Sequence, residues 1–338
     1  MLRPRCSVLS LLLVWGAGCA TTASPPEGWR ERLSDAPPPP PGDHFAIPPD
    51  ELEPLVRALD FEIRSAEPIG AGVTGALRMD AYYPDIDRTL TFKWKPAPEG
   101  GGGWNNTPRR EIAAYVIQDW FLEERDYVVP PTLGVCIPEE VYTVDDDDAE
   151  PSFPGASCIF GTLALWLEQV TEPDVLLDES RFYRDPHYAR HLANYNLLTY
   201  LIQNRDTRKG NYLVSKDDSN RRVYSIDNGI TFGEPIFNFF VPHWNAIRVP
   251  ALPREAIERL RRVGPEDLDA LAVVAEFRRD PHGVLHETDP SPPFEPEQGV
   301  RMRDGVLQLG LVPDEIDGVR KRLRELITAV EEGEIPVF

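Results

Sequence analysis

The pattern of apolar and polar side chains changes character about halfway along the chain. Up to residue 170, short segments alternate the two kinds, and residues 89–95 are the clearest, because apolar residues at even positions alternate with Thr or Lys at odd positions. A period of two residues predicts a β-strand with one buried face. Extended structure is also predicted for residues 61–63, 77–83, 128–133 and 159–170.

The remaining pattern is mainly helical. Residues 109–122 place apolar side chains on one stripe, and so do residues 187–202, residues 253–263 and the segment from Pro313 onward. The chain shows no internal repeat. A strand-rich first half followed by a helix-rich second half predicts the α+β class, with a cleft where the two halves meet.

The N-terminus has the organisation of a signal peptide, which we assign to residues 1–18. Two arginines precede the apolar stretch Val8–Trp15, which is shorter than the roughly 20 residues needed to span a bilayer. Small residues then lead to Cys19. This order resembles the lipobox of bacterial lipoproteins, in which the cysteine is acylated and becomes the new N-terminus, although Gly16 stands where leucine is usual. An ordinary signal peptide with an incidental cysteine is the alternative.

The lipid anchor implied by that resemblance would hold the protein on a membrane of the bacterial cell envelope, at the periplasmic face or the cell surface. Residues 19–50 are proline-rich, with a run at Pro37–Pro41, and are expected to form an extended spacer that does not fold. The folded part is then divided into residues 51–168 and residues 169–338. No later stretch is apolar enough to cross a membrane.

The net charge and the cysteine content limit which partners and which covalent bonds we expect for this protein. The formal net charge of −21 argues against nucleic acid as a partner, because binding its phosphates requires a basic surface. Cys6 would be lost with the signal peptide, and the lipobox resemblance implies that Cys19 carries a lipid, which leaves Cys136 and Cys158. Two remaining cysteines in an exported protein predict a disulfide across the acidic loop between them. Two free, buried thiols are the alternative.

A glycine-rich segment follows the first predicted strand. Gly70, Gly72 and Gly75 form the spacing G-x-G-x-x-G, in which glycine lets backbone N–H groups approach phosphate oxygens. A dinucleotide-binding fold requires a helix directly after this spacing, whereas here a second strand begins at Leu77. The arrangement favours a hairpin that covers a phosphate, and an ordinary glycine-rich turn is the alternative.

A lysine and a glutamate are placed to complete such a phosphate site. Lys93 and Lys95 project from the same face of one predicted strand, from which a lysine can reach nucleotide phosphates. Glu111, one turn inside the following helix, can hold that lysine by an ion pair. The sequence does not separate Lys93 from Lys95, and a solvent-exposed strand face would account for both.

The most specific spacing is an aspartate followed five residues later by an asparagine, Asp206 and Asn211. In kinase catalytic loops such an aspartate accepts the proton of the attacking hydroxyl, and the asparagine binds a metal ion. Arg208 could bring positive charge to the transferring phosphoryl group. Asp227 ends a short predicted strand in an Asp-x-Gly sequence, which suits a carboxylate that binds a divalent cation. A polar turn would account for Asp206 alone.

These segments resemble a group of atypical kinases. Asp227–Gly233 is similar to the D-N-G-x-x-F-G segment of the secretory-pathway (Golgi casein) kinases. Arg110–Tyr115 and Val129–Thr132 resemble the R-E-x-A-A-Y and V-P-P-T segments of bacterial phosphoinositide-kinase-like proteins, and the HipA-type toxin kinases are more distant relatives. The resemblance spans roughly residues 65–235.

Two positions depart from the pattern of protein kinases. Asn204 begins the Asn-Arg-Asp sequence in which those enzymes commonly have histidine, and Asn228 replaces the apolar residue that usually follows the metal-binding aspartate. Because of the change at Asn228, we expect that the activation switch of protein kinases does not operate in this protein.

The resemblance implies a bilobal protein-kinase-like fold that binds ATP with Mg²⁺ or Mn²⁺, with residues 51–168 as a strand-rich N-lobe and residues 169–338 as a helical C-lobe. The roles it implies are phosphate contact for Lys93, the ion-pair partner for Glu111, the base for Asp206, and metal binding for Asn211 and Asp227. The segment between the lobes would bind adenine through its backbone, at Leu165, Leu167 and Glu168.

The expected function is transfer of the γ-phosphoryl group of ATP to a hydroxyl on an unidentified protein, lipid or small molecule. Three alternatives stay open: a pseudokinase that binds a nucleotide or a partner, a nucleotidyl transferase on the same scaffold, and a purely structural envelope lipoprotein. The scarcity of ATP outside the cytoplasm favours the pseudokinase. The presence together of Lys93, Asp206, Asn211 and Asp227 favours catalysis.

Overall fold

The computed structural model describes residues 25–37, 40, 44–70, 75–103, 106–144, 150–233 and 244–338. Across these ranges the chain forms three antiparallel sheets and eight α-helices, which confirms the α+β class. None of the helices in this part of the chain is both long and apolar enough to cross a bilayer.

The first half of the chain forms a five-stranded sheet in the order β1-β2-β3-β5-β4. Its strands are β1 (Glu62–Pro68), β2 (Leu77–Tyr83), β3 (Arg88–Pro96), β4 (Thr132–Pro138) and β5 (Cys158–Leu165). The predicted segments 77–83 and 89–95, now β2 and β3, are confirmed. The other predicted segments overlap β1, β4 and β5 with shifted bounds.

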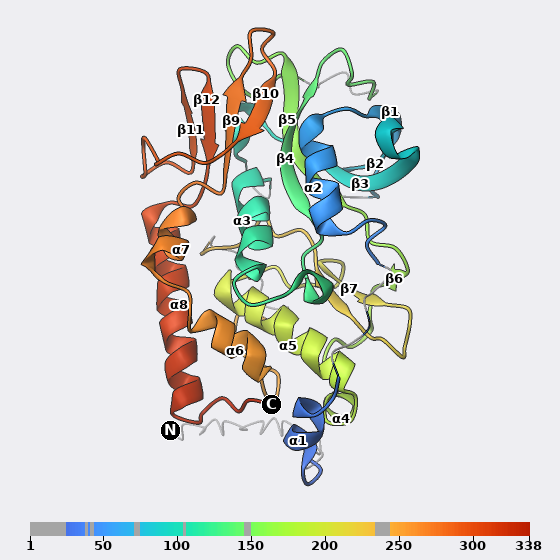
Figure 1. Ribbon diagram of the computed structural model, residues 1–338, viewed down its shortest axis with the longest axis vertical. Helices are drawn as coiled ribbons and strands as arrows, with labels where there is room; N and C mark the ends of the chain where they lie inside the picture. Colours follow the sequence, from blue (N-terminus) through green and yellow to red (C-terminus); the bar gives the residue numbers. More distant parts are fainter. Residues whose placement is uncertain are drawn as a thin grey trace, which may run out of the picture.

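β3 shows why this sheet has one apolar and one polar face. Leu90, Phe92 and Trp94 are buried in a core shared with α2 (Pro49–Ala58), which lies across that face in Figure 1. Burial of each such side chain contributes about 1.5–3 kcal/mol. The alternate residues, Lys93 and Lys95 among them, point to the opposite face and line a cavity there.

α3 (Pro108–Gln118) follows β3 and packs beside β4 and β5. Gly134 of β4 permits this close approach, because a Cβ atom at that position would lie 3.1 Å from Ile112 Cδ1 of α3 and 2.9 Å from Phe277 Cζ. The predicted helix at residues 109–122 is therefore confirmed, although it ends at Gln118.

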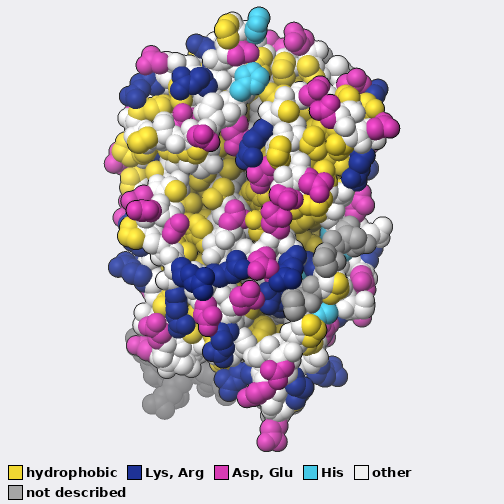
Figure 2. Space-filling model, in the orientation of Figure 1, with side chains coloured by type: hydrophobic (Ala, Val, Ile, Leu, Met, Phe, Trp, Pro, Cys, Tyr) yellow, Lys and Arg dark blue, Asp and Glu magenta, His cyan; other side chains and the backbone are white. Residues whose placement is uncertain are grey.

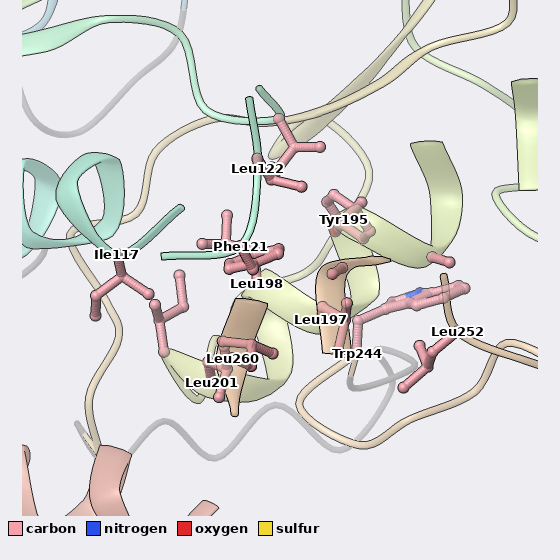
Figure 3. Packing of buried hydrophobic residues seen from close by; sticks show 14 of the residues in the cluster. Ile117, Phe121, Leu122, Tyr195, Leu197, Leu198, Leu201, Trp244, Leu252 and Leu260 are labelled. Carbon is pink, nitrogen blue, oxygen red and sulfur yellow. The ribbon is translucent and has the colours of Figure 1, made fainter. Parts of the chain in front are cut away.

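The lower part of the molecule in Figure 1 is helical and is organised around α5 (Pro186–Leu201), whose side chains are buried on nearly all sides. The other helices of this part are α4 (Glu179–Phe182), α6 (Arg254–Leu260), α7 (Pro265–Ala270) and α8 (Pro313–Glu331). Figure 3 shows Leu198 and Leu201 of α5 close to Phe121 and Leu260 within this core. The helices predicted from residues 187, 253 and 313 are confirmed.

A three-stranded sheet lies between the five-stranded sheet and α5. It consists of β6 (Val170–Thr171), β7 (Tyr212–Ser215) and β8 (Val223–Ser225), and β8 contacts α5. β7 and β8 carry, at their ends, the two loops in which the sequence predicted catalytic residues.

The prediction that residues 169–338 are helical is wrong for the segment before α8. A four-stranded sheet forms there in the order β10-β9-β12-β11, from β9 (Ala275–Arg279), β10 (Leu285–Thr288), β11 (Val300–Arg303) and β12 (Val306–Leu309). Figure 1 shows it beside β4 and β5, and Phe277 packs edge-on against Phe160 at 5.1 Å between ring centroids. The apolar residues of these strands alternate over only two or three positions, which is too short a pattern to stand out in the sequence.

The prediction that residues 19–50 form an unfolded spacer is also wrong for the residues that the structure describes. α1 (Trp29–Ser34) packs on the helical part, where Trp29 lies 4.9 Å from Tyr183 between ring centroids. His44 and Ile47 are buried, and α2 begins at Pro49. Aromatic and aliphatic residues among the prolines supply enough apolar surface to dock this segment. The predicted signal peptide and Cys19 lie outside the described residues.

The predicted disulfide is confirmed. Cys136 of β4 and Cys158 of β5 form a bond of 2.06 Å with their Cα atoms 5.3 Å apart. Both residues are fully buried, next to the apolar contact between the five-stranded and four-stranded sheets.

The surface carries both signs of charge. On the face shown in Figure 2, acidic and basic side chains are interspersed, and the densest group of Lys and Arg side chains forms a band below the middle of the view with Asp and Glu among them.

Candidate functional site

A cavity of about 650 Å³ lies between the polar face of the five-stranded sheet and the three-stranded sheet. Charged side chains reach it from β3 (Lys93 and Lys95), α3 (Glu111) and the segment after β8 (Asp227). Its apolar wall includes Ile69, Ala164, Leu165, Val170 and Leu213. An apolar wall with a few convergent charged groups is typical of small-molecule sites.

Lys95 is at the centre of these charges. Its ammonium nitrogen lies 3.2 Å from Glu111 Oε1 and 3.0 Å from Asp227 Oδ1, and its side chain is 2% exposed. Burial alone lowers the pKa of Lys95, but the carboxylates of Glu111 and Asp227 outweigh it and raise that pKa above the ordinary value. The amine is therefore charged at neutral pH.

The structure separates the two lysines that the sequence left equivalent. The partner of Glu111 is Lys95, so the expectation that Glu111 pairs with Lys93 is wrong. Lys95 lies one residue before the end of β3, at the end from which the chain leads to α3. The ion pair therefore forms with the lysine nearest to the helix.

Lys93 instead reaches Asp227. Its ammonium nitrogen lies 3.6 Å from Asp227 Oδ1, and its side chain is 22% exposed. Burial alone would raise the pKa of Asp227, but the charges of Lys93 and Lys95 lower it to about 2. Two ammonium groups thus converge on one carboxylate that stays ionised at neutral pH.

The backbone around Asp227 is held in an uncommon conformation. Asp227 has a φ of 59°, and a non-glycine residue in this region persists only where its surroundings hold it. The next N–H, that of Asn228, donates to Glu111 Oε2 at 2.9 Å, and Asn228 Oδ1 accepts from Ser225 Oγ at 2.8 Å. Asn228, which departs from the kinase pattern, therefore connects the loop after β8 to α3.

The loop before β7 joins Asp206 to Asn211. Asn211 Nδ2 donates to Asp206 Oδ2 at 2.9 Å and to the Asp206 carbonyl at 2.8 Å. Arg208 Nε lies 3.4 Å from Asp206 Oδ1, while its own side chain is half-exposed. Gly210, with a φ of 99°, permits the turn that returns the chain to Asn211.

Two hydrogen bonds link this loop to the loop of Asp227. The Ile226 N–H donates to the Asn211 carbonyl at 3.0 Å, and Asn204 Nδ2 donates to Asn228 Oδ1 at 3.2 Å. Asn204, where kinases commonly have histidine, is thus a structural contact between the loops. The two loops, predicted separately from the sequence, form one unit beside the cavity. Gly210 lines the cavity, whereas Asp206 and Asn211 do not.

The predicted adenine-binding segment follows β5 and lines the cavity. Two of its three predicted residues already use their backbone N–H groups: that of Leu165 donates to Pro131, and that of Glu168 to the His44 carbonyl at 3.1 Å. The Glu168 carbonyl also contacts His44 Nδ1 at 2.9 Å. These two N–H groups are therefore engaged within the protein, and the expected contact between the backbone of this segment and adenine stays a prediction. No backbone hydrogen bond within the described part of the chain engages Leu167.

The predicted glycine-rich hairpin connects β1 to β2. Gly70 and Gly75 have φ values of 53° and 65°, and the Ile69 N–H donates to the Ala76 carbonyl at 3.0 Å, which closes the hairpin. Ile69 lines the cavity, so the hairpin begins at its edge. Gly72 lies outside the described residues.

Sequence reasoning missed Arg78 and Lys216, which also line the cavity. One feature of the sequence could have identified Lys216. Only five of the 35 basic side chains of this protein are lysines, and three of the five, Lys93, Lys95 and Lys216, line this one cavity.

The residues available for a metal ion are few. In the part of the chain that the structure describes, no group of three or more His, Cys, Asp or Glu residues could hold one. Asp227 and Asn211 form a different donor set, one carboxylate and one amide. Because Asn211 directs its nitrogen to Asp206, its oxygen is the atom left for a cation. Mg²⁺ bound with a nucleotide takes only one or two protein ligands, so one carboxylate and one amide oxygen suit it in number and chemistry.

No protein-family model matches this chain, and no curated protein sequence shows significant similarity to it.

Proposed function

We propose that this protein is an ATP-dependent phosphotransferase with a bilobal kinase-like fold, which transfers the γ-phosphoryl group to a hydroxyl acceptor. The observation that carries the proposal is the convergence of Lys95, Glu111 and Asp227 in one ion-pair network beside the hydrogen-bonded pair Asp206 and Asn211.

The arrangement of elements supports two lobes. The five-stranded sheet and α3 make the first, and the three-stranded sheet with α4 to α6 makes the second. The cavity lies between them and is bordered by the segment after β5, through which the chain passes from the first part to the second. A nucleotide base would lie against Ala164 and Leu213 and bond to the backbone of Leu167.

The charges suit a polyphosphate. Lysine is a compact charge that binds phosphate oxygens, and the cavity contains Lys93, Lys95 and Lys216 in a protein whose net charge is −21. A divalent ion bound with ATP would neutralise charge on the phosphates, and Asn211 and Asp227 would hold it. Lys93 and Lys95 would then exchange Asp227 for phosphate oxygens.

Asp206 is the base in this proposal. Its carboxylate is oriented by Asn211 Nδ2 and lies near the exposed guanidinium of Arg208. From there it would accept the proton of the acceptor hydroxyl, while Arg208 would stabilise charge on the transferring group.

One observation favours the alternative of a pseudokinase. Asp206 is 5% exposed, is bonded to Asn211 and does not line the cavity. A carboxylate held in this position permits nucleotide binding without phosphoryl transfer. The test must therefore measure nucleotide binding and phosphoryl transfer separately.

The test combines thermal shift with label transfer from α- or γ-labelled ATP, with Mg²⁺ or Mn²⁺. We expect metal-dependent binding and transfer of the γ-label. Asp227→Ala should reduce the metal-dependent thermal shift, whereas Asp206→Ala should still bind ATP and lose transfer about 10²-fold or more. Asp269→Ala, at a side chain 74% exposed on α7, is the matched control.

Each other outcome identifies an alternative. Transfer of the α-label would indicate a nucleotidyl transferase, and binding without transfer a pseudokinase. Absence of any nucleotide-dependent shift in the parent protein would leave a structural envelope lipoprotein. If both aspartate variants bind and transfer as the parent does, the assigned roles are wrong.

A further inference from the structure

The C-terminal segment returns to the helix that carries Glu111. Glu315, in the first turn of α8, bonds to two consecutive arginines in the first turn of α3. Its Oε1 accepts from Arg109 Nη2 at 3.1 Å and from Arg110 Nη2 at 2.8 Å and Nε at 3.0 Å. Figure 1 shows the upper end of α8 near the level of α3.

The contact of Glu315 with Arg109 and Arg110 is buried, and its charged groups make further hydrogen bonds to the backbone. The side chains of Arg109, Arg110 and Glu315 are 12%, 11% and 7% exposed. Glu315 Oε2 also accepts the Val312 N–H at 3.0 Å, and Arg109 Nη1 donates to the Gly310 carbonyl at 3.2 Å. Charge-assisted bonds of this kind are strong and directional, so they fix the position of α3 relative to α8.

The first turn of α3 needs such support. No side chain caps it, because the Thr107 hydroxyl at the N-cap donates to the Gly103 carbonyl, and the Arg110 and Glu111 N–H groups share the Thr107 carbonyl at 3.0 and 3.4 Å. Positive side chains at a helix N-terminus are unfavourable because of the helix dipole. Arg109 and Arg110 would therefore loosen this turn if Glu315 did not neutralise them.

Glu111 is the next residue of the same turn. Successive helix residues differ in direction by about 100°, so Arg110 faces α8 while Glu111 faces the cavity and Lys95. Fraying or rotation of this one turn would withdraw Glu111 from Lys95.

We propose that Glu315 is a positioning residue, which holds the first turn of α3 so that Glu111 keeps Lys95 in place in the cavity. The C-terminal segment, in which the sequence carries no recognisable motif, thereby becomes part of the phosphate site. The consequence for phosphoryl transfer rests on the proposed function, whereas the coupling between Glu315 and Lys95 does not.

The first test measures the coupling without nucleotide. In Glu315→Gln we expect faster hydrogen exchange at residues 108–112 and faster modification of Lys95 by an amine-reactive reagent, quantified by mass spectrometry. Lys321, which is 70% exposed on α8, is the internal reference and should react as in the parent. Glu331→Gln, at a side chain 60% exposed on the same helix, is the matched control and should change neither readout.

The second test measures transfer. If the site phosphorylates, Glu315→Gln should lower kcat about 10- to 100-fold, because small misplacements of positioning groups have effects of that size, while the KM for ATP changes less. Glu315→Asp should recover part of the rate.

A neutral triple variant, Arg109→Gln/Arg110→Gln/Glu315→Gln, covers the case in which the single variant does not fold, because it leaves no buried charge without a partner. If a folded variant lacking Glu315 keeps the parent's exchange at residues 108–112 and the parent's reactivity of Lys95, the proposal is wrong. If the parent protein binds no nucleotide, only the proposed function is wrong, because the first test measures the coupling between Glu315 and Lys95 without nucleotide.

Discussion

At the scale of residues, the site depends on one buried lysine. Lys95 contacts the carboxylates of both Glu111 and Asp227, which lie close to each other and would repel without its charge. Lys93 contacts Asp227 only, from a more exposed position. The two lysines are therefore not equivalent, although they are two residues apart on one strand.

We predict that Lys95→Ala and Lys93→Ala differ in both stability and binding. Removing Lys95 leaves uncompensated buried carboxylates, which should lower the free energy of unfolding by about 3–5 kcal/mol and abolish the nucleotide-dependent thermal shift. Lys93→Ala should retain the fold and weaken nucleotide binding. Lys321→Ala is the control, and urea denaturation with thermal shift is the measurement. Equal effects of the two cavity variants would refute the distinction.

A substitution at Cys19, also at the scale of residues, tests the expected location on a membrane of the cell envelope. If its thiol carries the lipid, Cys19→Ser should move the protein from the membrane fraction to the soluble fraction of the envelope, and the parent should incorporate a labelled fatty acid. Cys6→Ser is the control. An unchanged distribution would favour the ordinary signal peptide.

At the scale of elements, α3 is held from two sides, by Lys95 and the loop after β8 on one side and by α8 on the other. Burial alone would raise the pKa of Glu315, but its bond to Arg109 and the neighbouring charges lower it below the ordinary carboxyl range. A lowered pKa in the folded state means that the carboxylate stabilises the fold above the ordinary pKa of about 4.3 and that this contribution disappears as the pH falls through the lowered value.

We therefore predict a pH dependence for the α3–α8 contact. The difference in unfolding free energy between the parent and Glu315→Gln should be constant from about pH 5 to 7 and shrink below about pH 4, as the carboxylate of the parent becomes protonated. Glu325→Gln should differ little from the parent across this range, because exposed ion pairs contribute about 0–1 kcal/mol. Urea denaturation at several pH values measures both differences. A difference that grows toward low pH would contradict the assignment.

Among the elements, the disulfide joins the neighbouring strands β4 and β5. Its cysteines are 22 residues apart, and closing a loop of this length restricts the unfolded chain enough to contribute about 3 kcal/mol. We predict that Cys136→Ala/Cys158→Ala lowers the unfolding free energy by about that amount. A reducing agent should destabilise the parent and leave the double variant unchanged. If reduction does not affect the parent, the bond does not form in solution.

At the scale of the whole molecule, segments distant in sequence meet on both sides of the cavity. His44, in the segment predicted to be a spacer, bonds to the backbone of Glu168 behind the cavity wall. Phe277 and Glu315, from the C-terminal third, reach β5 and α3. Both ends of the described chain thus support the site, so truncation at either end should affect it.

Much of the site was predictable because its chemistry is local. The alternation along β3 orients Lys93 and Lys95 to one face, and the loop from Asp206 to Asn211 spans only five positions. Such patterns follow from backbone geometry, which repeats every few residues. The choice between Lys93 and Lys95 was not predictable, because it depends on where α3 lies against the sheet.

The sequence by itself determined the α+β class, most of the strands and helices, and four charged residues that line the cavity, Lys93, Lys95, Glu111 and Asp227, and it favoured the disulfide over two free thiols. The tertiary structure alone decided that Lys95 pairs with Glu111, that His44 occupies the backbone of Glu168, and that residues 275–309 form a sheet against β4 and β5. The physical reason is distance along the chain. Propensity and periodicity act between near neighbours, whereas these contacts join residues from 16 to more than 100 positions apart, and their geometry exists only once the elements have packed.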